Sequence, residues 1–501
     1  MKPISQVAIL CFFAAMPAAR AANYNVGPNR ILKQLQDVAS HLNPGDTVFV
    51  DGGATYAGDA TFTRPGSVDK PIVILGVAAA GKRPLISGGT NTVHFKSDYP
   101  YKNGGDHYVF QGFEITGGSS RCVYHQADDI LMRDLIVHDC PAHGILSGDV
   151  GSGSLTLESS EVYRCGSGTQ KHQIYMSTDE VNHPGSVFRM QYCYVHDAAG
   201  GNNVKSRSER NEIYYNWIEG AYYHELELIG SDPGGVDDGW TPHLKREDSD
   251  VLGNVFWKKG TAAKNDSNFA VFRIGGDGTG ETHGRYRFVN NTVIAGTGAV
   301  FRCFDSLESV EMHNNVFHRP GGGLNLMREV EAAWTQGHAV IAGSDNWITA
   351  GAVNAPTEWT GTKEGADPGF ADFAKGDLRP AANSLLVNAG NAAPTGPMGF
   401  PFPKPSFPPA FYPAVRSAPL SPPVRVAQGA IDIGAFEEGA LTALVKRGRL
   451  ERGGGPVAYL LRVRGGLLIE RKAGGFGGRE SGPPGMRESW TLSGHGFTGP
   501  R

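Results

Sequence analysis

The sequence predicts an all-β solenoid, in which short parallel strands wind into a stack of coils. A motif of alternating apolar residues recurs nine times, and in five of these copies an Asn precedes the apolar residues. Successive copies lie 22 to 38 residues apart, which suits coils of three short strands joined by loops of variable length. β-branched and aromatic residues dominate the motif, which excludes helical repeats. A propeller is the alternative, but each blade needs about 40 or more residues.

The Asn residues of the motif predict a ladder inside the stack. They are Asn216, Asn254, Asn291, Asn315 and Asn346, and the four copies without Asn start at Gly112, Asp134, Ser160 and Cys193. Equivalent positions on neighbouring coils lie about 4.8 Å apart. Stacked side-chain amides at that spacing can hydrogen-bond to one another.

The two ends of the solenoid also have sequence signals. Leu32, Leu35, Val38, Ala39 and Leu42 have helical spacing and predict an N-terminal capping helix over the open edge of the first coil. Residues 45–50 and 71–74 read as strands of the first coils. Residues 394–424 are rich in proline, which excludes the interior of a sheet and predicts an extended arm on the surface.

These motifs resemble a known family. Residues 43–48, 53–56 and 70–74, with the Asn-Asn repeats, resemble right-handed parallel β-helix proteins of the pectate-lyase-like superfamily. The resemblance runs from about Asn25 to Glu437, so we expect one right-handed parallel β-helix domain over residues 22–438. It implies that residues 377–380 and 384–390 form the last coils and that residues 431–437 form a closing strand.

The terminal segments differ from this domain. Lys2, an apolar stretch and a small-residue site at Ala19–Ala21 predict a signal peptide over residues 1–21, and therefore a secreted or periplasmic protein. Residues 439–501 are rich in Gly and Arg, lack the repeat and are expected to be mostly disordered. This tail carries a net charge of +7, which leaves the mature body near −13.

Composition and charge exclude several classes of protein. Hydrophobic residues make up 40% of the chain, which excludes wholesale disorder, and the 69 glycines have no collagen period. No long apolar run follows the N-terminus, so we expect no membrane span. An acidic body is a poor nucleic-acid binder. We expect a monomer.

Five cysteines remain after the signal peptide, so at least one thiol must be unpaired within the chain. Cys140 and Cys165 follow equivalent strands on consecutive coils. Stacking would bring their Cα atoms into disulfide range, so a bond between them is one pairing that the sequence allows, and the pairing itself stays open.

A polar stripe is expected on one outward face of the coils. Alternation in residues 204–207, 225–228, 271–274 and 300–303 places one set of side chains inward and the other outward. The outward set is Tyr175, Lys205, Arg207, Glu225, Glu227, Arg273 and Arg302. Tyr222, Tyr223 and His224 lie in a flanking loop and would line the rim of a groove.

The stripe fits an acidic polysaccharide that is cleaved by β-elimination. Guanidinium groups would bind sugar carboxylates, and neutralising the carboxylate acidifies the adjacent C–H. Lys205 or a tyrosine would take that proton, and Arg207 would favour the neutral form of Lys205. Glu225 and Glu227 act in the opposite direction.

A second resemblance concerns Lys205. Val204-Lys205-Ser206, followed by Asn211 and Tyr215-Asn216, resembles the stretch that carries the catalytic lysine in the alginate-lyase and chondroitinase-B group. The resemblance implies that role for Lys205. That group also has a Leu-Arg-His-Gly run about one coil later, whereas residues 227–230 here contain neither Arg nor His.

The sequence also allows other functions. Glu225 with Glu227, or Asp237 with Asp238, could be the acid and base of a glycoside hydrolase. The chain could also be a carbohydrate-binding surface protein without activity, and the stripe could be a salt-bridge ladder that only fixes register. Calcium is a candidate cofactor because Asp232, Asp237, Asp238 and Asp277 are oxygen donors in glycine-rich loops, whereas no zinc pattern is present.

Overall fold

The computed structural model describes residues 21–439 apart from 99, 102, 234, 236–246, 280–281, 305–306 and 330–339, together with residues 459–462 and 468–471. The chain divides into a unit of residues 1–439 and a unit of residues 440–501. In the second unit, β37 (Tyr459–Arg462) pairs with β38 (Leu468–Arg471) in antiparallel fashion. The predicted signal peptide up to residue 20 and the rest of the predicted tail lie outside the described residues.

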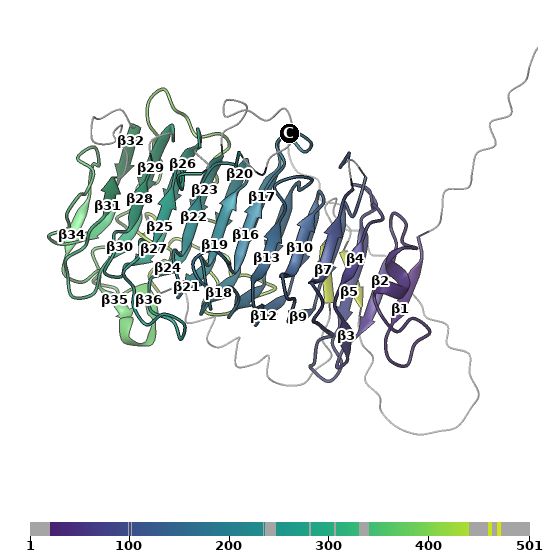
Figure 1. Cartoon of the computed structure of the whole chain (residues 1–501). Helices are drawn as coiled ribbons and strands as arrows, with labels where there is room; N and C mark the ends of the chain where they lie inside the picture. The colour runs from purple at the N-terminus through teal and green to yellow at the C-terminus, as the bar shows by residue number, and fades with distance from the viewer. Residues whose placement is uncertain are drawn as a thin grey trace, which may run out of the picture. The chain divides into compact units, whose positions relative to one another are not determined.

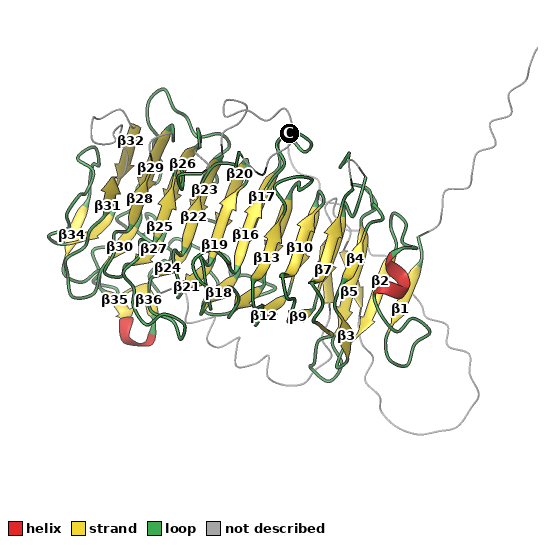
Figure 2. Cartoon of the chain, in the orientation of Figure 1, coloured by secondary structure: helices red, strands yellow, loops and turns green. Residues whose placement is uncertain are grey.

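The first unit consists of three long parallel sheets, shown in Figures 1 and 2. Sheet A has 12 strands. They are β1 (Asn23–Val26), β2 (Thr47–Asp51), β5 (Ile72–Val77), β8 (Tyr108–Gln111), β11 (Ile130–Arg133), β14 (Leu155–Glu158), β17 (Val187–Gln191), β20 (Arg210–Tyr214), β23 (Asp248–Leu252), β26 (Arg285–Val289), β29 (Ser309–His313) and β32 (Val340–Ser344).

Sheet B also has 12 strands. They are β3 (Thr55–Ala57), β6 (Leu85–Ser87), β9 (Glu114–Thr116), β12 (Ile136–His138), β15 (Glu161–Tyr163), β18 (Tyr194–His196), β21 (Trp217–Glu219), β24 (Val255–Trp257), β27 (Thr292–Ile294), β30 (Val316–His318), β33 (Trp347–Thr349) and β34 (Lys363–Gly365).

Sheet C has ten strands and carries the predicted polar stripe. They are β4 (Ala60–Phe62), β7 (Asn91–Lys96), β10 (Arg121–Gln126), β13 (His143–Ser147), β16 (Ile174–Ser177), β19 (Val204–Arg207), β22 (Leu226–Leu228), β25 (Phe272–Ile274), β28 (Phe301–Cys303) and β31 (Met327–Glu329). Along most of each sheet, the neighbour of a strand is the third strand further along the chain. One coil therefore contributes one strand to each sheet, which is the right-handed parallel β-helix that the sequence predicts.

The core lies between the three sheets. Inward residues of sheet C, such as Val204, Leu226, Phe272 and Phe301, are fully buried in one apolar cluster that runs through the coils. Their outward neighbours alternate with them as expected from strand geometry. No helix within the described ranges is long and apolar enough to cross a membrane.

The asparagine ladder is confirmed. The Oδ1 atom of Asn254 accepts hydrogen bonds from the backbone N (2.9 Å) and Nδ2 (3.0 Å) of Asn216, and the same pairs of bonds join Asn254, Asn291, Asn315 and Asn346 in turn. The residue before each Asn, for example Tyr215 with φ 58°, has a left-handed backbone conformation that turns the chain from sheet A into sheet B. The ladder therefore satisfies buried polar groups at the sharpest corner of each coil.

The N-terminal helix is shorter than expected. α1 (Gln36–Ala39) is a single turn, but Leu35, Val38, Ala39 and Leu42 are all buried in the core cluster. The carboxylate of Asp37 accepts hydrogen bonds from the backbone N atoms of Lys33 and Gln34, at 2.7 and 2.9 Å, which favours a turn before the helix. The apolar spacing thus identified the buried residues correctly and overestimated the length of the helix.

The C-terminal end of the first unit departs from the expected coils. β36 (Asp377–Pro380) pairs with β35 (Phe370–Asp372) as an antiparallel hairpin around the 3₁₀ helix η1 (Phe373–Lys375). Residues 384–390 and 431–437 form no strand. They pack instead beside the Asn corner of the coils, where Gly434 N donates to Asn314 O at 2.7 Å and Ile433 N donates to Leu386 O at 3.0 Å. The resemblance located this closing segment but not its conformation.

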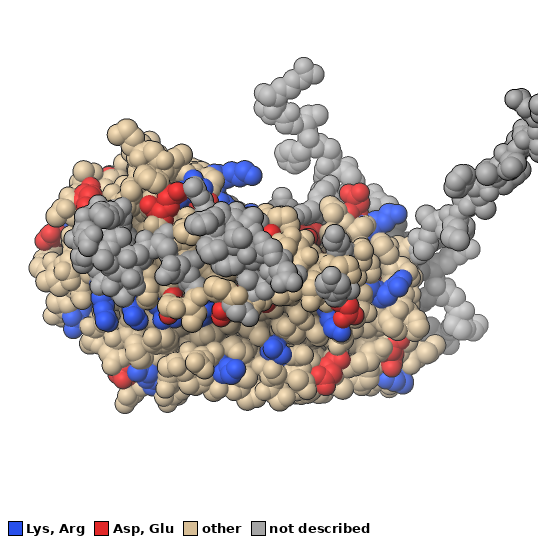
Figure 3. All heavy atoms as spheres, turned by 45° about the horizontal axis from the view of Figure 1, so that its top comes forward, with Lys and Arg blue, Asp and Glu red and all other residues tan. Residues whose placement is uncertain are grey.

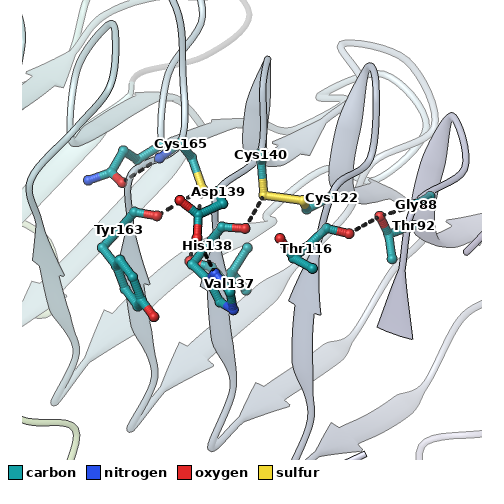
Figure 4. Close-up of a disulfide and its surroundings, with 11 residues drawn as sticks. Gly88, Thr92, Thr116, Cys122, Val137, His138, Asp139, Cys140, Tyr163 and Cys165 are labelled. Carbon is teal, nitrogen blue, oxygen red and sulfur yellow. Dashed lines mark hydrogen bonds and ion pairs between the residues drawn. A yellow bond between two sulfur atoms is a disulfide. The ribbon is translucent and has the colours of Figure 1, made fainter. Parts of the chain in front are cut away.

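The candidate disulfide between Cys140 and Cys165 does not form. Cys140 bonds to Cys122, with a Cα–Cα distance of 5.9 Å, and the thiol of Cys165 is free and buried (Figure 4). Cys140 lies in the turn that leads from β12 into β13, and β13 pairs with β10, which contains Cys122. The bond therefore joins a turn to the neighbouring strand, whereas stacking of equivalent positions directs Cys165 toward the backbone oxygen of Tyr163, at 3.3 Å.

Residues 394–424 follow the outer side of the coils. Arg285 and Arg210 donate to backbone oxygens of Pro401 and Pro403, at 2.8 and 2.9 Å. Further along, Ser159 donates to Pro419 O at 2.8 Å. Because Arg285, Arg210 and Ser159 belong to successively earlier coils, this segment runs back toward the N-terminal end of the stack.

Candidate functional site

The polar stripe is a single column of outward residues on sheet C. The strand register places Tyr175, Lys205, Glu227, Arg273, Arg302 and Arg328 next to one another on β16, β19, β22, β25, β28 and β31. Neighbouring members are therefore about 4.8 Å apart along the stack. The sequence predicted the first five members in this order.

The first part of the column forms a buried ion-pair cluster, which we call the closed cluster: Tyr175, Lys205, Arg207, Glu227 and Asp277. Lys205 Nζ lies 3.4 Å from Glu227 Oε1 and 3.1 Å from Asp277 Oδ2. Arg207 donates to Asp277 Oδ2 at 2.8 Å and to the hydroxyl of Tyr175 at 2.9 Å. The side chains of Lys205 and Arg207 are only 9% and 2% exposed. The cluster is thus paired internally and nearly closed to solvent.

Glu227 is the centre of this cluster. It is fully buried, accepts a hydrogen bond from Asn202 and pairs with Arg273. Burial alone would raise the pKa of Glu227, but Lys205 and Arg273 outweigh it and hold the pKa at about 2. Glu227 therefore stays ionised and pairs with two cations.

Glu225 has the opposite electrostatic environment. Burial raises its pKa to about 7, and the nearby Lys258, at 3.8 Å, opposes that rise. Its carboxylate accepts hydrogen bonds from Asn203 Nδ2 at 2.5 Å and from Ala221 N at 2.9 Å. The pKa of Glu225 therefore lies above the ordinary value of a glutamate, and the pKa of Glu227 lies below it.

The second part of the column opens toward solvent. We call it the arginine column: Arg273, Arg302 and Arg328. Arg273 is 11% exposed at its side chain, Arg302 is partly buried and Arg328 is exposed. Within the described part of the chain no carboxylate lies in ion-pair range of Arg302 or Arg328. Burial, Arg273 and Arg328 together lower the pKa of Arg302. Figure 3 shows Lys and Arg side chains in a row on the left part of the face that it presents.

An aromatic rim lies beside the column in the turn before β22. The guanidinium of Arg273 lies 5.6 Å from the ring centre of Tyr223, and Lys264 Nζ lies 5.7 Å from that of Tyr222. His224 Nδ1 donates to Ala270 O at 2.8 Å, and burial lowers the pKa of this histidine to about 3. His224 is therefore neutral and buried, behind the more accessible tyrosines.

The structure corrects three details of the predicted stripe. Lys205, Arg207, Glu225 and Glu227 point outward but are buried, because neighbouring side chains and the loop after β25 cover them. Glu225 lies opposite Asn203, on the same two coils as the Lys205–Glu227 pair and one outward position earlier along the chain. Arg207 bonds to Asp277 rather than to a glutamate. A Lys205→Ala change would therefore disturb a buried network of ion pairs.

The sequence analysis did not recognise Arg328 as part of the column. A signal was present, because Leu326-Met327-Arg328 repeats the two apolar residues and Arg of Val271-Phe272-Arg273 and Val300-Phe301-Arg302. The sequence also suggested Asp277 as a candidate calcium ligand, whereas in the structure its carboxylate pairs with Lys205 and Arg207. No sequence signal joins residues so far apart, since the loop after β25 must fold back to make this contact.

The described residues show no preformed metal site. They contain no group of three or more His, Cys, Asp or Glu side chains arranged to hold a metal ion. Glu225 and Glu227 are oxygen donors next to Asn203 and Asn202, but Lys258, Lys205 and Arg273 already provide the positive charge beside them. Asp237 and Asp238 lie outside the described residues.

Comparison with known proteins finds similarity in fold. No family model and no curated protein matches the chain. An alginate lyase from Paenibacillus sp. is 15% identical, with 61% of this chain and 98% of that chain covered and a TM-score of 0.41. Pectate lyase Pel9A is 13% identical, with 84% and 97% covered and a TM-score of 0.42. A GH136 lacto-N-biosidase from Eubacterium ramulus is 13% identical, with 65% and 68% covered and a TM-score of 0.44.

At these identities the likeness concerns the fold alone. The strand topology by itself shows the parallel β-helix fold.

Proposed function

We propose that the protein binds an acidic polysaccharide along the arginine column and cleaves it by β-elimination. The observation that carries this proposal is the stack of Arg273, Arg302 and Arg328 on three successive strands of sheet C. Like charges directly opposite one another on a sheet destabilise it. A row of guanidinium groups is therefore costly unless an anion binds to it.

A polymer of uronic acids has the chemistry that this row would recognise. A guanidinium group binds a carboxylate through two parallel hydrogen bonds. The rungs are about 4.8 Å apart, so carboxylates that recur along an extended chain could meet successive arginines. The rings of Tyr222 and Tyr223 beside the column would pack against sugar faces. Because the body of the protein carries a charge near −13, this local row of positive charge is needed to attract a polyanion.

β-Elimination needs a cation on the carboxylate and a base near the adjacent C–H. Arg273 would supply the cation, and Lys205, two rungs away, is the candidate base. In this structure Lys205 Nζ is paired with Glu227 and Asp277. Elimination thus requires that substrate binding rearranges these pairs.

Glycoside hydrolysis is the second candidate function. The observation that favours it is the pair Glu225 and Glu227, whose pKa values of about 7 and about 2 suit an acid and a base. Both carboxylates are fully buried and hydrogen-bonded to Asn203 and Asn202. Hydrolysis by this pair would require the covering residues to move.

One experiment separates these functions. The protein is incubated with polygalacturonate, alginate and a neutral polymer, and products are followed by ultraviolet absorbance and by reducing ends. Elimination gives both signals, because it forms an unsaturated sugar, whereas hydrolysis gives reducing ends alone. We expect Arg302→Ala to weaken binding of the acidic polymer about tenfold or more, as loss of a charge-assisted pair of bonds would.

Arg164→Ala is the matched control, since Arg164 is an exposed arginine that pairs with Asp139 on sheet B, away from the column. Equal binding by wild type, Arg302→Ala and Arg164→Ala would reject the proposed site. Absence of any product would reject cleavage and leave a binding protein.

We also propose that the protein is exported, as the N-terminal sequence predicts. The Cys122–Cys140 disulfide supports this, because such bonds persist in oxidising compartments. The monomeric state stays a prediction that sedimentation can test.

A further inference from the structure

The carboxylate of Asp277 lies between the two cations of the closed cluster. Its Oδ2 atom is 3.1 Å from Lys205 Nζ and 2.8 Å from a guanidinium nitrogen of Arg207. Its Oδ1 atom accepts hydrogen bonds from Thr279 N at 2.9 Å and Thr279 Oγ1 at 2.7 Å. Burial would raise the pKa of Asp277, but Arg207 and Lys205 outweigh it and lower that pKa. Asp277 is thus a carboxylate held by an ammonium and a guanidinium group.

Asp277 reaches this position from a different coil. It follows β25, whereas Lys205 and Arg207 lie on β19, two rungs earlier in sheet C. The loop has Gly275 with φ 94° and Gly278 with φ 89° on either side of Asp277, conformations that favour glycine. A Cβ atom at Gly278 would meet nothing within 4 Å. Asp277 and Thr279 both hold the loop against β19, since Arg207 donates to them at 2.8 and 3.1 Å.

The groups around Asp277 are those that would recognise a sugar carboxylate. Lys205 and Arg207 supply the charge, and the hydroxyl of Tyr175 lies 2.9 Å from Arg207 Nε. They continue the same column that contains Arg273 and Arg302. Glu227 lies on the rung between Arg273 and Lys205, so a polymer bound to the arginine column would pass that rung before a further carboxylate reaches the position that Asp277 holds.

We propose that Asp277 is an internal competitor for this site: its carboxylate takes the place of a uronic-acid carboxylate and must be displaced by the polymer. This inference rests on the proposed function and specifies how the site is regulated. The apparent affinity for substrate equals the intrinsic affinity multiplied by the fraction of molecules in which Asp277 has left the two cations. The contact would also restrict tight binding to polymers with several carboxylates in a row, because a single uronic acid gains too little to displace Asp277.

Asp277→Asn tests the competitor directly, because the amide keeps the shape of the side chain and removes its charge. The probes are D-galacturonate and a galacturonate oligomer, titrated into wild type and variant by calorimetry at constant ionic strength, with D-galactose as the neutral probe. We expect about tenfold or greater tightening for both acidic probes in Asp277→Asn, and no change for galactose. Asp266→Asn is the matched control, since Asp266 pairs with Lys264 on another loop.

A second variant guards against misfolding of the first. Thr279→Val removes the hydroxyl bond to Asp277 Oδ1 but keeps the carboxylate, so we expect a smaller gain in affinity. Unchanged or weaker binding in both Asp277→Asn and Thr279→Val would overturn the inference.

The outcome is distinguishable from failure of the proposed function. If wild type binds the oligomer, Arg302→Ala weakens that binding and Asp277→Asn leaves it unchanged, the competitor is rejected and the site stands. If Asp277→Asn binds D-galacturonate more tightly while no acidic polymer binds wild type or depends on Arg302, the inference holds and the proposed function fails.

Discussion

The closed cluster and the arginine column are adjacent parts of one outward face, yet their charged side chains differ in pairing and in exposure to solvent. In the closed cluster, Lys205 and Arg207 are each paired with a carboxylate and are at most 9% exposed. In the arginine column, Arg302 and Arg328 follow one another with no carboxylate in range among the residues described. The first arrangement stabilises the fold, and the second leaves charge available for a ligand.

Strand alternation alone therefore does not identify a binding surface. Both regions follow the same inward and outward pattern, and the register predicts both equally well. What separates them is the loop after β25, whose Asp277 pairs with Lys205 and Arg207, whereas Arg328 on the last rung is exposed. Breaking a buried ion pair lowers the free energy of unfolding strongly, whereas removing an exposed arginine changes it little.

Breaking the closed cluster should have the largest effect. Glu227→Gln removes the carboxylate between Lys205 and Arg273 and leaves two cations without its charge, so we expect a loss of about 3–5 kcal/mol in the free energy of unfolding. Denaturant titration measures it. Arg328→Ala in the open region is the comparison, with an expected change within about 0.5 kcal/mol. Similar losses in the two variants would contradict the distinction between the regions.

The glutamate next to the cluster should make stability depend on pH. Burial raises the pKa of Glu225 to about 7, above its ordinary value of 4.5, so the folded protein holds a proton that the unfolded chain releases. Its contribution to stability is full below pH 4.5 and declines as pH rises toward 7, by about 3 kcal/mol in all.

Glu225→Gln should remove this decline. We would measure the free energy of unfolding from pH 4.5 to 8, and the difference between wild type and variant should move against wild type as pH rises. Parallel pH profiles would show that Glu225 is ionised in the folded protein across the whole range.

The arginine column should give the smallest effect, and one of opposite sign. Arg302→Gln relieves repulsion between stacked guanidinium groups, so we expect a stabilisation of about 0.5 kcal/mol or less at low ionic strength. The gain should vanish near 1 M salt, where the Debye length is about 3 Å. Arg164→Gln, which loses its pair with Asp139, should show no such gain. Thermal unfolding at two salt concentrations measures both, and a stabilisation of Arg302→Gln that persists at high salt would point to packing instead.

The repeat, and with it the succession of coils, could be predicted from the sequence alone. Asn216 and Asn254 recur at one corner of each coil, and Phe272 and Phe301 recur at inward positions of sheet C, because period-two alternation and side-chain stacking are local properties of the chain. The same periodicity gave the order Lys205, Glu227, Arg273 and Arg302, since parallel register follows from aligning the repeats.

Which of these outward residues are covered, and what they contact, depends on the paths of the loops in the folded protein. Asp277 meets Lys205 because a loop folds back over two rungs, and Cys140 bonds to Cys122 rather than to Cys165 because a turn brings it to the neighbouring strand. Loop paths depend on the sum of many weak contacts and on φ values that Gly275 and Gly278 permit but do not dictate. The repeat fixes which residues align, and the loops fix which of them reach solvent.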